Sequence, residues 1–150
     1  MKKSKYLIIG ILLCLSCRYE RSTLSKFVVS NNTNEVIRIF PTLSLADTLL
    51  LLPNETKEFD QGSNRGLSDG INFAFFADGY PVTVMFNLTD TIIHYRDTLT
   101  HSKNYYKETD KRNFYNTSSY SKEIISNSKY TQSVTLKYVF TNADYLDAKK

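Results

Sequence analysis

One pentapeptide in the chain matches a motif for a catalytic nucleophile. Residues 66–70 read GLSDG, which is a literal G-x-S-x-G with Ser68 at its centre. In α/β-hydrolases this motif places the serine on a sharp turn between a strand and a helix, with an acid and a histidine further along the chain. Here polar residues precede Ser68 and a strand-like pattern follows it, so the setting of the motif is missing. A hydrolase that uses Ser68 is therefore only a distant alternative, and we predict that the protein is not an enzyme.

The two histidines of the chain are the next candidates for chemistry, as metal ligands. His94 and His101 have Asp90 and Asp97 nearby in the sequence. Their spacing matches no zinc motif, and no third ligand accompanies them. The sequence also has no glycine-rich phosphate loop between a strand and a helix, and no carboxylates paired as acid and base. We predict neither a metal nor a cofactor.

A long polar segment, residues 101–132, is rich in aromatic side chains. Tyr105, Tyr106, Tyr115 and Tyr120 alternate there with lysine, asparagine and serine. Tyrosine rings beside amide and hydroxyl groups suit a glycan or a protein partner, because each ring offers a large apolar face and loses little entropy. The alternative is that these tyrosines pin a long crossover onto the body of the protein, with each hydroxyl bonded at the surface. These four residues are the candidate ligand-binding residues.

The elements that position these residues are predicted to be strands. No window repeats apolar residues at helical spacing over three turns. Alternation is clearest at residues 71–75, 82–86 and 134–140, and Asp78-Gly79 is a hairpin signal between the first two. Shorter strands are expected at residues 27–29, 36–40, 48–52, 56–59 and 91–95. The pattern predicts an all-β fold, an antiparallel β-sandwich, although a small closed barrel has the same periodicity.

The amino terminus has the pattern of a signal peptide. Lys2, Lys3 and Lys5 precede an apolar run over residues 6–15, which is too short to span a bilayer. The following stretch, LCLSC, ends at Cys17 and resembles a bacterial lipobox, although Cys14 stands where leucine is usual. The resemblance implies cleavage before Cys17 and acylation, including palmitate, of that cysteine. Residues 1–16 are thus predicted to be a signal peptide, residues 17–25 a lipidated tether and residues 26–150 the β-sandwich domain.

Cleavage would change the charge and the cysteine content of the protein. Removing the three lysines lowers the net charge from +4 to +1, so the mature domain has no basic footprint for nucleic acid. Its two cysteines would be removed or acylated, which leaves no disulfide to stabilise the fold. About 130 residues are enough for one domain with its own core. We expect a monomer.

Several stretches together resemble a known group of proteins. The lipobox, FVVSNNTNEVIRIF, LLLLPNE and YVFTNADY look like the small uncharacterised lipoproteins of Bacteroidota, over most of the mature chain. The resemblance implies an immunoglobulin-like β-sandwich and a place in the cell envelope. Residues 18–21 lack both the acidic run of surface-exported lipoproteins and the aspartate that retains lipoproteins in the inner membrane. The resemblance therefore implies an outer-membrane protein whose domain faces the periplasm.

Three tripeptides resemble the O-glycosylation acceptor sequence of the same bacteria. They read Asp, Thr and an apolar residue, and they place Thr48, Thr91 and Thr98 as candidate sugar acceptors. The alternative is that Asp-Thr simply begins a strand, with the apolar residue as its first core position. Taken together, the sequence predicts a non-catalytic binding or accessory module for a glycan or an envelope protein. A purely structural envelope component is the alternative.

Overall fold

The described part of the chain consists mainly of β-strands. The computed structural model describes residues 22–41, 48–65, 80–102 and 104–150. Within these ranges the elements are β1 (Ser22–Asn31), β2 (Ile37–Phe40), β3 (Leu49–Leu51), β4 (Thr56–Arg65), β5 (Val82–Phe86), β6 (Asp90–His94), β7 (Tyr105–Tyr106), the 3-10 turn η2 (Thr117–Ser119), β8 (Ser121–Asn127), β9 (Thr131–Phe140) and α2 (Asn142–Ala148). The prediction of an all-β fold is confirmed.

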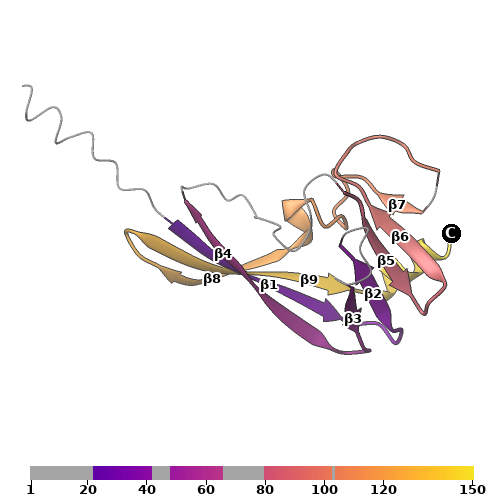
Figure 1. Ribbon diagram of the computed structural model, residues 1–150, viewed down its shortest axis with the longest axis horizontal. Helices are drawn as coiled ribbons and strands as arrows, with labels where there is room; N and C mark the ends of the chain where they lie inside the picture. Colours follow the sequence, from indigo (N-terminus) through magenta and orange to yellow (C-terminus); the bar gives the residue numbers. More distant parts are fainter. Residues whose placement is uncertain (1–21, 42–47, 66–79, 103) are drawn as a thin grey trace, which may run out of the picture.

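These strands form two open sheets (Figure 1). Sheet A has the order β4-β1-β9-β8, and sheet B has the order β3-β2-β5-β6-β7. Apolar side chains from both sheets belong to one core, so the arrangement has two layers. The described strands are therefore not joined into the single closed sheet that the periodicity also allowed.

Both sheets are mixed, which corrects the predicted antiparallel pairing. β1 runs parallel to β9, and β6 runs parallel to β7. The other five pairs are antiparallel. Alternation of apolar residues indicates which side chains share a face of a strand, but it carries no information on the direction of the neighbouring strand. That direction depends on the long connections, which have no apolar period.

The core lies where the second halves of β1 and β9 pack against sheet B. Fully or nearly fully buried side chains come from sheet A (Phe27, Val29, Leu136, Tyr138, Phe140) and from sheet B (Ile37, Ile39, Leu51, Val82, Val84, Phe86, Ile92). Phe86 and Phe140 meet edge to face across the two sheets, with ring centroids 5.9 Å apart. Aromatic rings favour this geometry because the positive edge of one meets the negative face of the other.

The other half of sheet A extends beyond sheet B (Figure 1). The first five residues of β1 are exposed or half-buried, whereas its last five are buried. Every residue of β8 is exposed. The ladders are irregular here, between Leu24 and Lys26 and between Ile124 and Ser126. Such bulges raise the local twist of a strand and are frequent at sheet edges.

The boundaries of some elements differ from the predicted ones. The predicted tether, residues 17–25, overlaps β1, because residues 22–24 already pair with β4 and with β9. Their side chains are mostly polar, but neighbours on both sides satisfy their backbone hydrogen bonds, which side-chain periodicity cannot reveal. β5 occupies the predicted range and pairs with β2 and β6. The hairpin partner expected for it at residues 71–75 lies outside the described residues.

Candidate ligand-binding cleft

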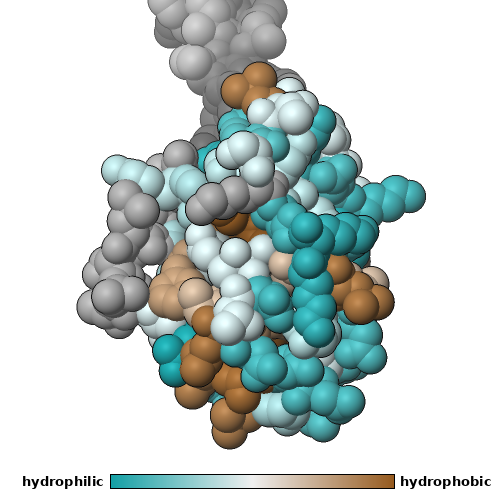
Figure 2. Space-filling view, turned by 90° about the vertical axis from the view of Figure 1, so that its right-hand side faces the viewer, coloured by the Kyte–Doolittle hydropathy of each residue, from teal (hydrophilic) through white to brown (hydrophobic). Residues whose placement is uncertain are grey.

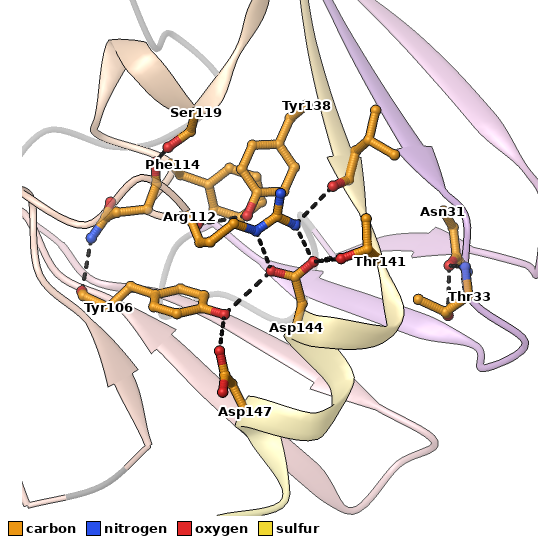
Figure 3. Close-up of polar contacts among 12 residues, drawn as sticks. Asn31, Thr33, Tyr106, Arg112, Phe114, Ser119, Tyr138, Thr141, Asp144 and Asp147 are labelled. Carbon is orange, nitrogen blue, oxygen red and sulfur yellow. Dashed lines mark hydrogen bonds and ion pairs between the residues drawn. The ribbon is translucent and has the colours of Figure 1, made fainter.

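A buried ion pair connects the long loop before β8 to helix α2 (Figure 3). The Nε of Arg112 donates to Oδ1 of Asp144 at 2.7 Å, and Nη2 donates to Oδ2 of the same carboxylate. The Nη2 also donates to the carbonyl oxygen of Val139 at 2.9 Å. The carboxylate is fully buried, while the guanidinium is partly exposed. A bidentate contact of this kind is strong and directional, so it holds the loop in one position on α2.

Asp144 also caps the first turn of helix α2, which explains why the helix starts there. Its Oδ2 accepts a hydrogen bond from the backbone N–H of Thr141 at 2.7 Å and one from the Thr141 hydroxyl at 3.1 Å. The bond to the backbone N–H of Thr141 is one half of a capping box, whose other half runs from the backbone N–H of Asp144 to the side chain of Thr141. A capping box satisfies backbone groups that the first turn of a helix leaves without partners. One carboxylate thus both starts the helix and binds the loop.

Tyr106 joins the same network from β7 (Figure 3). Its hydroxyl donates to Oδ2 of Asp147 at 2.9 Å and lies 3.3 Å from Oδ1 of Asp144. Burial and the neighbouring carboxylates of Asp144 and Asp147 raise the pKa of Tyr106 well above its usual range. Hydrogen bonds from Lys150 and from Tyr106 lower the pKa of Asp147. At neutral pH the phenol therefore remains a donor and Asp147 remains an ionised acceptor.

Next to Tyr106 lies a cleft of about 500 Å³. Its lining comes from β6, from β7 and the loops on both sides of it, and from the end of α2 and the residues after it. It consists of Ile92, Asn104, Tyr105, Tyr106, Asp110, Asp147 and Lys150. The volume is within the range of small-molecule pockets. The cleft combines apolar and aromatic surface with an amide, two carboxylates and an ammonium group, so it presents both acceptors and donors to a polar ligand.

Contacts within the protein fix the orientation of these polar side chains. The Asn104 amide donates to the carbonyl oxygen of Ala148 at 2.8 Å, and Oδ2 of Asp110 accepts from the backbone N–H of Lys107 at 2.8 Å. Each contact uses only part of the capacity of the group, because an amide has two donors and an acceptor and a carboxylate accepts up to about four hydrogen bonds. The cleft is therefore preorganised and retains hydrogen-bonding capacity.

A stack of rings continues from the cleft along the loop after β6. The rings of Tyr95 and His101 are parallel, with centroids 3.5 Å apart, and the edge of Tyr105 meets His101 at 5.3 Å. The Nε2 of His101 lies 2.9 Å from Oδ1 of Asp97, and this hydrogen bond lowers the pKa of Asp97. All four side chains keep some exposure. Tyr105 thus belongs both to this stack and to the cleft.

His94, the other histidine, lies in the core. Its Nδ1 accepts the backbone N–H of Phe114 at 3.0 Å, so in the neutral ring the hydrogen is on Nε2. Burial and the charge of Arg112 lower the pKa of His94 to about 3. The Nε2 has no hydrogen-bond partner among the described residues. Those residues also contain no group of three or more histidine, cysteine, aspartate or glutamate side chains suited to a metal ion.

The four candidate tyrosines are divided between the cleft and the core. Tyr105 and Tyr106 line the cleft together. Tyr115 and Tyr120 are nearly buried, and their hydroxyls donate to the carbonyl oxygens of Tyr80 and Phe114, each at 2.6 Å. Tyr115 thus attaches the loop to the residues before β5, and the ring of Tyr120 packs on Phe27 and Tyr138 of sheet A. Both residues hold the loop on the body of the protein, which the alternative interpretation of the segment describes, and the binding hypothesis depends on Tyr105 and Tyr106.

The candidate acceptors for sugar differ in accessibility. Thr98 is exposed in the loop between β6 and β7, whereas Thr91 is half-buried within β6 and Thr48 is half-buried before β3. Around Thr98, Oδ1 of Asp97 accepts the backbone N–H of Leu99 at 2.9 Å, which makes an Asx turn. A bulky glycan needs an exposed hydroxyl. Of the three, Thr98 has the most suitable surroundings.

Two other predicted positions, Cys17 and Ser68, lie outside the described residues. Within the described ranges, no helix has the length and the apolar character that crossing a membrane requires. No family model, curated protein or solved structure matches the chain.

Sequence reasoning missed half of the cleft. Asp110 lies in the predicted segment, four residues after Tyr106, but it was not among the candidates. Asp147 lies in a short helix that was not predicted, and Lys150 follows that helix. A signal for that helix exists, because Thr141 and Asp144 have the spacing of a capping box. Nothing in the sequence marks Arg112, since its role depends on a partner 32 residues away.

Proposed function

We propose that the protein is a lipid-anchored envelope protein that binds a carbohydrate in the cleft at Tyr105 and Tyr106 without transforming it. The observation that carries this proposal is the composition of the cleft: two tyrosines, two carboxylates, an amide and an ammonium group around about 500 Å³. We further propose a monomer that binds no nucleic acid, with an immunoglobulin-like arrangement of the two sheets, which is supported by their shared core.

The proposed anchor is supported by the amino-terminal residues. A basic start, a short apolar run and Cys17 in a lipobox-like setting are the features that direct export and acylation. Several acyl chains hold a protein on a membrane stably, whereas one chain does so only marginally. We place the domain at the outer membrane, facing the periplasm, because residues 18–21 lack the charged signals for other destinations.

A carbohydrate fits the chemistry of the cleft better than an apolar ligand does. A sugar ring has a polarised C–H face, which the negative face of a tyrosine ring attracts. Its hydroxyls both donate and accept, so they can bond to the Asp110 and Asp147 carboxylates and to the Asn104 amide at the same time. The partial exposure of Tyr105 and of the adjacent rings of Tyr95 and His101 leaves aromatic surface for a second sugar unit.

A non-catalytic role agrees with the surroundings of the two histidines. His94 packs flat against Phe114 in the core, with ring centroids 4.3 Å apart, and His101 is bonded to Asp97. Neither contact presents a base to a nucleophile at the cleft. A purely structural envelope component is the alternative, and the measurement of carbohydrate binding distinguishes it from a binding module.

Acylation is tested by growth with a clickable palmitate analogue. We expect the wild-type chain to incorporate the label and to sediment with outer membranes. The Cys17→Ala variant should lose the label and become soluble. If the wild type is unlabelled and partitions like Cys17→Ala, the anchor proposal is wrong.

Carbohydrate binding is tested with the purified full-length lipoprotein in detergent, first on a glycan array and then by calorimetry with the strongest hit. Tyr105→Ala should weaken binding about ten-fold, which corresponds to about 1.4 kcal/mol. Asp147→Asn should also weaken it, because the charge that accepts sugar hydroxyls is lost. Tyr130→Ala is the matched control, since Tyr130 is a half-exposed tyrosine outside the cleft. Absence of any hit, or equal binding by all variants, would favour the structural alternative.

A further inference from the structure

The protruding end of sheet A lies next to the point where the chain enters the structure. The backbone N–H of Ser22, the first residue of β1, donates to the carbonyl oxygen of Tyr130 at 2.9 Å. Tyr130 belongs to the turn that joins β8 to β9. The tip of this hairpin and the start of β1 are therefore one end of the molecule, and Figure 1 places it opposite α2.

A lipid on Cys17 would hold this end close to the membrane. Ser22 follows Cys17 by five residues in the sequence. A fully extended chain spans at most about 3.6 Å per residue, so the start of β1 lies within about 18 Å of the acylated residue. The hairpin tip is hydrogen-bonded to Ser22, so it is held at a similar distance from the acylated residue.

Four exposed large apolar side chains lie at this end of the molecule. We call the set Leu24, Ile124, Ile125 and Tyr130 the anchor-end surface; their exposed fractions lie between 47% and 61%. Leu24 and Ile125 also line a groove of about 350 Å³, together with Val134. The opposite end of the molecule, seen in Figure 2, shows hydrophilic residues together with hydrophobic ones, which gather in the lower part of the view.

The charges around this surface suit a lipid headgroup layer. The ammonium of Lys129 lies 5.3 Å from the ring centroid of Tyr130, at the tip of the hairpin. Tyrosine and lysine are the side chains that combine an apolar body with a polar end, and both are frequent at membrane interfaces. Lys26, which also lines the groove, is exposed and bonded to Glu58.

The edge of sheet A is poorly suited to pairing with a second copy. β8 forms this edge and carries Lys122 and Glu123, and its ladder is interrupted between Ile124 and Ser126. Charged side chains and bulges are the usual means by which an exposed edge avoids pairing with another strand. We therefore do not expect pairing of β8 with a second copy to cover the apolar side chains near this edge.

We propose that the anchor-end surface docks into the headgroup region of the same bilayer that holds the lipid on Cys17. This inference rests on the proposed anchor. In the docked orientation the hairpin tip and the start of β1 contact lipid, and the cleft beside α2 is at the end away from the membrane, where a ligand has access. We choose lipid as the partner because the short connection between Cys17 and β1 keeps this surface close to the membrane.

Docking is tested with single fluorescent probes on the mature lipoprotein. Its Cys17 is blocked by lipid, so Ile125→Cys gives one free thiol for an environment-sensitive dye. Leu146→Cys on α2 is the matched control, because the two side chains are 61% and 60% exposed and neither substitution disturbs the core. Each protein is reconstituted into vesicles of phosphatidylethanolamine and phosphatidylglycerol that carry spin-labelled lipid.

We expect lipid spin labels near the headgroups to quench the Ile125 probe at least about two-fold, since interfacial residues lie about 5–10 Å into the headgroup and acyl boundary. The Leu146 probe should be unaffected. An unquenched Ile125 probe on protein that sediments with the vesicles would overturn docking while leaving the anchor intact. Loss of both proteins from the vesicles would overturn the anchor and docking together. A shielded but unquenched Ile125 probe, with dimers formed by cross-linking, would show that a second copy covers the surface.

Discussion

The two ends of sheet A are built from the same strands but differ in what covers them. At one end, the second halves of β1 and β9 pack on sheet B, and Phe140 contacts Phe86, Phe114 and Tyr138. At the other end, the first halves of the same strands are mostly half-buried or exposed, and every residue of β8 is exposed. Backbone pairing is continuous along β1 and β9, so pairing alone does not distinguish the two ends.

The difference lies in which buried polar groups are present. The packed end holds the Arg112–Asp144 pair, the Tyr106 hydroxyl and His94, and their bonds determine where the loop after β7 and helix α2 lie. Among the described residues, the protruding end holds an exposed pair between Lys26 and Glu58. Stability and the shape of the cleft should therefore depend on the packed end, while the protruding end is available for an interaction.

The largest contrast is expected from apolar truncation at each end. Phe140→Ala removes a fully buried ring and should lower the free energy of unfolding by about 3–5 kcal/mol. Ile124→Ala, on the exposed strand β8, should change it by less than about 0.5 kcal/mol. Urea unfolding followed by circular dichroism measures both. Equal losses would mean that the protruding end is packed in solution.

The two ion pairs give the next contrast. Asp144→Ala leaves the Arg112 charge without its partner and removes the cap of α2, so we expect a loss of about 3 kcal/mol, at the lower limit for buried pairs because Arg112 is partly exposed. Glu58→Ala breaks an exposed pair with Lys26 and should cost less than about 1 kcal/mol. Asp144→Ala should also abolish ligand binding, which Glu58→Ala should leave unchanged. A small effect of Asp144→Ala would contradict the assigned role of the buried pair.

The strands could be predicted from the sequence wherever one face is buried. Val82, Val84 and Phe86 alternate with half-buried residues in β5, and the predicted range is the observed one. β8 could not be predicted, because all its residues are exposed and it has no apolar face to give a period. The parallel pairing of β1 with β9 was missed for another reason: it joins residues more than 100 positions apart, and only tertiary packing determines it.

For the cleft, the sequence indicated the aromatic part and missed the charged part. Tyr105 and Tyr106 were recognisable because aromatic residues stand out in a polar segment. Their two companions, Tyr115 and Tyr120, have the same type and similar neighbours, but their hydroxyls reach backbone carbonyls inside the fold. Exposure depends on where the loop is held, and Arg112 and Asp144 hold it through contacts that leave no local pattern.

The next prediction concerns pH and belongs to the packed end alone. The folded-state pKa of His94 is lowered to about 3 from an ordinary value of 6.5, so the unfolded chain binds this proton more readily. The stabilisation from the neutral, buried His94 is complete above pH 6.5. It decreases by about 1.4 kcal/mol for each pH unit between 6.5 and 3, so that about 2 kcal/mol is lost at pH 5. His94→Gln keeps an acceptor for the Phe114 N–H but does not titrate. Unfolding measured from pH 7.5 to pH 5 should show a smaller slope for this variant; parallel slopes would contradict the burial of His94.

The smallest contrast compares one hydroxyl at each end. The Tyr138 hydroxyl donates to the carbonyl oxygen of Arg112 at 2.6 Å and ties β9 to the loop. Burial and the charge of Asp144 raise its pKa well above the usual range, so the hydroxyl is a donor at neutral pH. Tyr138→Phe should lower the free energy of unfolding by about 1 kcal/mol, since a buried acceptor loses its partner. Tyr130→Phe, at the half-exposed tip of the hairpin, should change it by less than about 0.5 kcal/mol, because water replaces any lost contact. If the two substitutions had equal effects in urea unfolding, the loop would not depend on its bond to β9, and its other contacts, among them the Arg112–Asp144 pair, would hold it.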